Sequence, residues 1–102
     1  MDSLSMMAED FKLLGDKTRL NILALLRVKE MCVCDIVEQL DVSQSSTSQH
    51  LRKLKAAGIV KEERRGQWVY YSLHMEGKAY IHDALKFLPD INLIAKHDTS
   101  SC

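Results

Sequence analysis

Apolar residues near the N-terminus recur with helical spacing and predict two helices separated by a short break. Met7, Phe11 and Leu14 fall at positions i, i+4 and i+7, which places them on one face of a helix. Gly15-Asp16 then interrupts the pattern, as the end of a helix does. From Thr18 a second run is so rich in leucine and isoleucine that we expect this helix to be buried on most sides.

Two short amphipathic segments follow and are joined by a tight turn. The first, residues 35–40, has its apolar residues on one face, and Asp35 near its start suits the helix dipole. The second is predicted to begin after Ser43, a good N-cap, and to run to about Ala57, because Gly58 is placed to stop it. Two short helices, the second polar on its outer side, are typical of a helix-turn-helix.

The hydrophobic period changes after this helix pair. Residues 59–63 and 68–73 are rich in β-branched and aromatic side chains, and residues 64–67 between them read as a turn, so a β-hairpin is predicted. A hairpin in this place is a wing. A last helix is expected over residues 75–88, before Pro89 ends it. The predicted fold class is therefore mostly α with a small β-hairpin, a winged helix-turn-helix.

The length of 102 residues indicates one small domain, which raises the expectation of a dimer. We expect residues 1–89 to form the DNA-binding and dimerisation domain and residues 90–102 to form a flexible, polar C-terminal tail. No apolar stretch approaches the roughly 18 residues of a membrane span, and no basic-then-apolar leader is visible at the N-terminus. These features predict a cytoplasmic protein without a membrane partner.

The formal net charge is zero, but the charge is unevenly distributed along the chain. Residues 44–72 carry a net charge of +4 and residues 1–43 a net charge of −3. A concentrated positive region suits phosphate neutralisation on double-stranded DNA, although a solvated charged face explains the charge alone equally well. The expected DNA contacts are Gln44, Ser45, Ser46, Ser48, Gln49 and Arg52 on the second short helix and Arg64 and Arg65 on the wing. His50 on the same helix is expected near a phosphate.

Cys32 and Cys34 form the strongest chemical signal, because their i, i+2 spacing does not suit a helix interior. Such residues point about 200° apart on a helix, whereas one ion needs both sulfurs within roughly 2.3 Å. An extended or first-turn backbone puts both on one side. We therefore expect that binding of a soft ion unwinds the start of the following helix. The third cysteine, Cys102, lies in the tail and is a tentative third ligand.

Four blocks stand in order along the chain: LLGDKTRLNIL (13–23), MCVCDI (31–36), VSQSSTSQHL (42–51) and GQWVYYSL (66–73). Together they resemble the ArsR–SmtB family of metal-sensing repressors, over about residues 8–88. The resemblance implies a winged-helix homodimer, with the first and last helices at the interface. It further implies a repressor without enzymatic activity that binds a near-palindromic operator and leaves it when metal binds.

The Cys-Val-Cys-Asp form within this family resembles the arsenite and antimonite sensors, which implies As(III) or Sb(III) as inducer and a role in arsenical resistance. Some arsenic sensors carry a third cysteine three residues after Cys34, where this chain has Val37. Cadmium or lead sensing is the first alternative, although that branch usually adds N-terminal cysteines and residues 1–31 contain none. Thiol-redox or persulfide sensing by the same cysteines is the second alternative. A small dithiol oxidoreductase would leave the helix-turn-helix unexplained.

Overall fold

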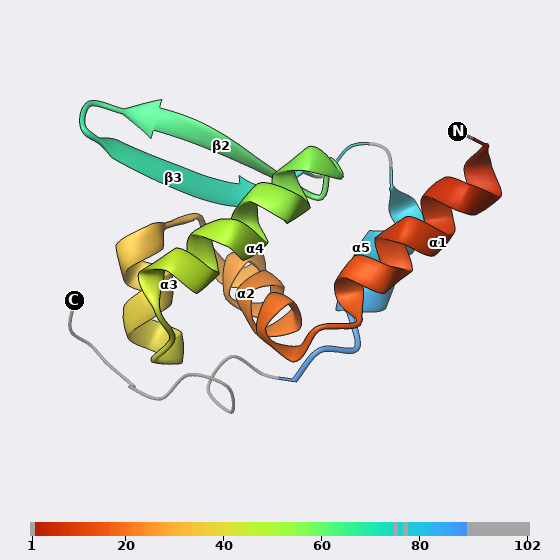
Figure 1. Ribbon diagram of the computed structural model, residues 1–102, viewed down its shortest axis with the longest axis horizontal. Coiled ribbons are helices and arrows are strands. Elements are labelled where there is room, and N and C mark those ends of the chain that lie inside the picture. Colours follow the sequence, from red (N-terminus) through yellow and green to blue (C-terminus); the bar gives the residue numbers. More distant parts are fainter. Residues whose placement is uncertain (1, 75, 77, 90–102) are drawn as a thin grey trace.

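The computed structural model describes residues 2–74, 76 and 78–89, and within them a small sheet lies at one edge of a group of helices (Figure 1). The wing and α3 occupy one end of the molecule, and α1 extends away from them at the other end. The elements run in the order α1 (Ser3–Leu14), α2 (Lys17–Val28), β1 (Met31–Cys32), α3 (Val33–Leu40), α4 (Gln44–Ala56), β2 (Val60–Arg65), β3 (Trp68–Leu73) and α5 (Ala79–Leu85).

Side-chain caps begin three of the helices. Asp2, Asp16 and Ser43 start α1, α2 and α4, and each side chain accepts a hydrogen bond from the backbone N–H three residues later, at 2.7, 3.0 and 3.1 Å respectively. Such caps satisfy N–H groups that the first turn of a helix leaves without partners. The predicted break before Asp16 and the predicted cap at Ser43 are both confirmed.

The helix-turn-helix consists of α3 and α4, joined through Asp41, whose backbone is left-handed with φ of 56°. Thr47, Leu51 and Leu54 point inward from α4 and are fully buried, as their spacing predicts. The prediction for the start of α3 was wrong by two residues. This helix begins at Val33 rather than at residue 35, so Cys34 lies within its first turn.

The wing is the antiparallel pair of β2 and β3, with Arg65 opposite Trp68 at its tip. The predicted turn over residues 64–67 was too long, because Arg64 and Arg65 belong to β2 and only two residues connect the strands. Gly66 has a φ of 64°, a conformation that a two-residue hairpin turn requires and that glycine adopts without steric cost.

A third strand, β1, was not predicted and pairs with the inner strand of the wing. The sheet order is β1-β3-β2, and Met31 and Cys32 lie opposite Tyr71 and Tyr70. A strand of two residues has no recognisable period, so its partner on the wing must supply its conformation. The pairing attaches the cysteine-containing segment directly to the wing.

Helix α5 is shorter than predicted, because it begins at Ala79 rather than at residue 75. Residues 86–88 continue it as a tight turn with hydrogen bonds from each N–H to the carbonyl three residues earlier. Residues 75 and 90–102 lie outside the described residues, so the division of the chain at Pro89 and the flexible tail stay predictions.

A partly buried polar network joins α1 to α5. Asp10 is 2% exposed, and its carboxylate binds the ammonium of Lys78 at 3.0 Å and accepts a hydrogen bond from the hydroxyl of Tyr80. Lys78 also donates to the carbonyl of Ala57, the C-cap of α4. One ammonium thus ties the first helix to the end of α4.

The core itself is built on α2, whose central residues are buried on all sides as predicted. The buried cluster contains Leu14, Ile22, Leu23, Leu25, Leu26, Met31, Ile36, Leu40, Leu51, Leu54, Ile59, Val60, Ile81 and Leu85. Every element except β3 contributes to it, which holds the helix-turn-helix and the base of the wing in one unit. Among the described residues, no helix is long and apolar enough to cross a membrane.

Candidate functional site

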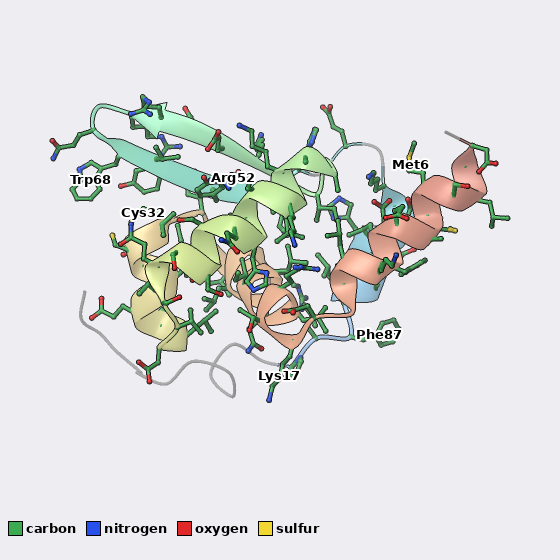
Figure 2. All side chains as sticks on the ribbon, viewed as in Figure 1. Met6, Lys17, Cys32, Arg52, Trp68 and Phe87 are labelled. Atoms are coloured by element: carbon green, nitrogen blue, oxygen red, sulfur yellow. The ribbon has the colours of Figure 1, made fainter. Side chains whose placement is uncertain are left out.

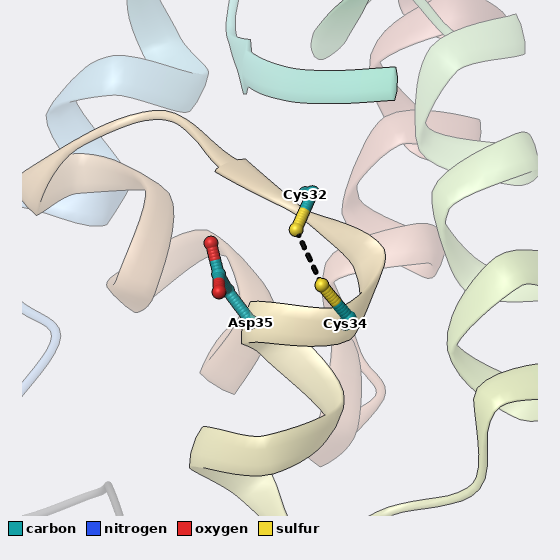
Figure 3. Close-up of side chains that lie close together, drawn as sticks. All are labelled: Cys32, Cys34 and Asp35. Carbon is teal, nitrogen blue, oxygen red and sulfur yellow. Dashed lines mark hydrogen bonds between the residues drawn. The ribbon is translucent and has the colours of Figure 1, made fainter. Parts of the chain in front are cut away.

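The two cysteine thiols lie side by side at the start of α3 (Figure 3). Cys32 is the N-cap, with extended backbone angles φ −84° and ψ 169°, and Cys34 lies in the first turn. Their sulfurs are 2.7 Å apart. Because the helix begins between them, both side chains already point to the same side. The expectation that an ion must unwind the helix to bring the sulfurs together is therefore wrong.

A carboxylate completes a group of three possible ligand atoms. One oxygen of Asp35 and the sulfurs of Cys32 and Cys34 all lie within 4.8 Å of one another. The residue types combine two soft donors with one hard donor, a set that binds soft or borderline ions. The sequence marked Asp35 only as a favourable residue for the helix dipole. Cys102, the tentative third ligand, lies outside the described residues.

The Cys32 thiol is protonated at neutral pH. Burial, followed by the hydrogen bond with the Cys34 thiol, raises the pKa of Cys32 to about 11. The Asp35 backbone N–H acts in the opposite direction, and the negative charge of the same residue's carboxylate adds to the rise. An ion that binds the pair as thiolates must therefore displace a tightly held proton.

The thiol pair lies where the wing meets the helix-turn-helix. Cys32 belongs to β1 and is paired with Tyr70 of β3. Cys34 belongs to α3, which packs against α4. The two sulfurs therefore belong to segments that contact the wing on one side and α4 on the other.

Six of the residues predicted to contact DNA lie on α4, and all six are at least partly open to solvent. Gln44, Ser45, Gln49 and Arg52 are exposed, and Ser46 and Ser48 are half-buried. His50 faces α2 instead, where its Nδ1 accepts a hydrogen bond of 3.0 Å from Nε of Arg19. The polar surface of α4 is therefore open to DNA, whereas the His50 ring is already hydrogen-bonded to Arg19 of the same chain.

The two wing arginines have different surroundings. Arg64 is exposed on β2. The guanidinium of Arg65 donates to both carboxylate oxygens of Glu30, at 2.6 and 2.9 Å, and to Glu63 at 2.9 Å. It also lies over the ring of Tyr70, with Cζ 4.8 Å from the ring centroid. Nothing in the sequence marks Glu30 as its partner, because the two residues are 35 positions apart.

Comparison with known proteins finds that the sequence of this chain is similar to those of bacterial regulatory proteins. Residues 16–62 match the model of the family described as "Bacterial regulatory protein, arsR family". The chain is 43% identical over 83 residues to the arsenic resistance transcriptional regulator ArsR1 of Pseudomonas putida, covering 80% of this chain. It is 42% identical over 82 residues to the cadmium resistance transcriptional regulatory protein CadC homolog of Staphylococcus aureus, covering 74% of this chain and 68% of the relative.

A solved structure agrees with these sequence matches. The transcriptional repressor PagR of Bacillus anthracis superposes with a TM-score of 0.72 at 32% identity, covering 85% of this chain and 97% of that one. The chain spans only 65% of the length of the Pseudomonas regulator. The shared region nevertheless includes the helix-turn-helix, since the family match extends from the start of α2 into β2.

Proposed function

Since this chain belongs to the arsR family of bacterial regulatory proteins, we propose that it is a metalloid-responsive transcriptional repressor. It binds operator DNA as a homodimer and leaves the DNA when As(III) or Sb(III) binds Cys32 and Cys34. The observation that carries the proposal is the pair of adjacent thiols at the junction of the wing and the helix-turn-helix.

Exposed apolar side chains at one end of the molecule support the homodimer. Leu4, Met6 and Phe11 of α1 are 77%, 41% and 45% exposed, and Phe87 after α5 is 88% exposed. Figure 2 shows Met6 and Phe87 at the end opposite Cys32 and Trp68. An apolar surface of this kind on a small domain favours burial against a second copy. The thiol pair and the wing then remain outside the interface.

The outer surface of α4 supports DNA binding. Gln49 and Arg52 carry side chains that can bond base edges in two places at once, and the serines Ser45, Ser46 and Ser48 suit phosphate oxygens. Gln44 is exposed in the first turn of the same helix, and Arg64 is exposed on the wing. In a dimer, two such helices reach successive major grooves about one helical turn apart.

The thiol pair fits a soft ion as ligand, with Asp35 as the third donor from this chain. Thiolates select soft ions, and arsenite bound by two sulfurs keeps one oxygen ligand. Sulfur ligands of one ion at roughly 2.3 Å are separated by about 3.3 to 3.8 Å, whereas the two thiols are 2.7 Å apart. Binding replaces the thiol–thiol hydrogen bond by two sulfur–ion bonds, which changes the separation of β1 and the start of α3 and shifts the wing relative to α4.

A cadmium- or lead-responsive repressor is the second candidate, and the carboxylate of Asp35 is the observation that favours it. Two sulfurs and one oxygen within 4.8 Å suit a divalent ion of intermediate softness. Redox sensing by the same pair ranks lower, because a pKa of about 11 for Cys32 leaves little thiolate for attack at neutral pH.

The decisive experiment is a titration of a fluorescent operator duplex bound to the protein. Arsenite, antimonite, cadmium, lead and zinc are added in turn, and the released fraction is measured by anisotropy. We expect arsenite to release the wild type, Cys34→Ser to bind DNA without release, and Cys102→Ser to behave as wild type if the tail is not a ligand. Release by cadmium but not arsenite, lost in Asp35→Asn, would establish the second candidate. Release by none of the ions contradicts both.

A further inference from the structure

We propose that Glu30 and Arg65 form a clasp that transmits movement of the cysteine segment to the wing, so that Arg65 is a positioning residue and not primarily a DNA contact. This wing clasp, defined as the two carboxylate–guanidinium hydrogen bonds of 2.6 and 2.9 Å, rests on the proposed ion-dependent release. The sequence suggested a different role for Arg65, as a DNA contact on the wing.

The two hydrogen bonds of the clasp hold the Arg65 guanidinium in one orientation relative to Glu30. Both guanidinium Nη atoms of Arg65 meet the two oxygens of Glu30, so the pair is bidentate and fixes an orientation as well as a distance. The same guanidinium covers Tyr70, the residue paired with Cys32 in the sheet. An arginine held on three sides by Glu30, Glu63 and Tyr70 can reach a phosphate only by giving up these contacts.

The clasp gives the cysteine segment a second attachment to the wing. The first is the ladder in which Met31 and Cys32 face Tyr71 and Tyr70, in the middle of β3. The second joins Glu30 to Arg65, which lies opposite Trp68 beside the turn. A two-residue ladder alone acts as a hinge. The Glu30–Arg65 contact adds a second point of attachment nearer the tip of the wing. A shift of residues 30–32 therefore rotates the whole hairpin of β2 and β3.

The position of Glu30 ties it to the ion site. It is two residues before Cys32 in the chain, so any displacement of β1 on ion binding displaces it too. Glu63 also contacts Arg65 but lies within β2, two residues away in the same strand. Of the two carboxylates that bind Arg65, that of Glu30 comes from the cysteine segment and that of Glu63 from the wing itself.

The test compares Glu30→Gln with the matched control Glu63→Gln, because each removes one carboxylate from the same guanidinium. Two measurements are made on the full chain: the change in Trp68 emission on adding arsenite without DNA, and the factor by which arsenite weakens binding to an operator duplex. Trp68 is the single tryptophan and is 50% exposed at the wing tip, so its emission reports the wing directly.

We expect Glu30→Gln to lose most of the arsenite-induced Trp68 change and to reduce the release factor on the order of threefold to fivefold, the range of an exposed ion pair. Glu63→Gln should keep both responses. Both side chains of the clasp are partly exposed, at 43% and 39%, so Glu30→Gln should stay folded, with a melting temperature within about 4 °C of wild type.

Two results would overturn the clasp while leaving the proposed function intact. One is an unchanged release factor and Trp68 response in Glu30→Gln. The other is tighter DNA binding by Glu30→Gln with an unchanged arsenite response, which would mean that Glu30 only competes with phosphate for Arg65. Failure of the proposed function is distinct, because the wild type itself would then show no release and no Trp68 response.

Discussion

Replacing Lys78 by methionine should destabilise the fold far more than removing an ordinary surface lysine. The substitution keeps most of the aliphatic stem but removes the ammonium that binds the carboxylate of Asp10 at 3.0 Å. It also removes the donor to the carbonyl of Ala57 at the end of α4. Asp10 is then left as a carboxylate inside the protein, with the hydroxyl of Tyr80 as its remaining hydrogen-bond donor from α5.

The magnitude follows from burial. The side chain of Asp10 is 3% exposed and that of Lys78 is 20% exposed. Breaking a buried pair by removing one partner costs about 3–5 kcal/mol. Because Tyr80 still donates to Asp10 and Lys78 is partly solvated, we place the cost at about 2–4 kcal/mol, which lowers the melting temperature by about 8–16 °C for a domain of this size.

Urea and thermal denaturation, followed by circular dichroism at one fixed protein concentration, measure this cost. Lys86→Met is the control, because its pair with Asp83 has side chains 71% and 68% exposed and should contribute less than about 0.5 kcal/mol. The double variant Asp10→Asn/Lys78→Met should recover part of the loss, since no unpaired charge remains buried. The reasoning fails if Lys78→Met unfolds within about 0.5 kcal/mol of wild type, or if the double variant is no more stable than Lys78→Met.

Three further predictions concern the helix cap, the wing turn and the thiol. Ser43→Ala removes the acceptor 3.1 Å from the first turn of α4 and should cost about 1 kcal/mol in urea unfolding; an unchanged midpoint would argue against the cap. Gly66→Ala forces a side chain into φ of 64° and should cost about 1–2 kcal/mol, more than Gln67→Ala beside it. Because the pKa of Cys32 is raised to about 11, its proton is bound below that pH and must leave when cadmium binds. Competition with a chelator should therefore show cadmium affinity rising about tenfold per pH unit for this thiol between about pH 7 and 9, and a flat profile would mean that the thiol is already ionised.

The local features of the fold were predictable because each has a signature within a few residues. Asp16 and Ser43 mark helix starts by side-chain chemistry, and the apolar run of α2 marks a buried helix by composition. Thr47 and Leu51 mark the inner side of α4 by their spacing of four. Capping and helical period act between neighbours in the chain, so the sequence alone determined the helix-turn-helix and its outer polar surface.

The cysteine pair was recognised from its spacing, but its geometry was not. Whether Cys32 and Cys34 share a side depends on where α3 begins, and β1 decides this by pairing Met31 and Cys32 with β3. The partner Tyr70 is 38 positions from Cys32 in the numbering. A pairing over that distance depends on which surfaces the core brings together, and no local pattern encodes it.

The same distinction applies to the charged residues, whose positions along the chain were predictable and whose partners were not. The sequence by itself determined that positive charge gathers on the second half of the helix-turn-helix and the wing. Only the tertiary structure decided that Arg65 is held by Glu30, that Asp10 is buried against Lys78, and that the thiols are attached to the wing. A charge is a property of one residue, whereas its partner is set by the packing of elements far apart in the chain.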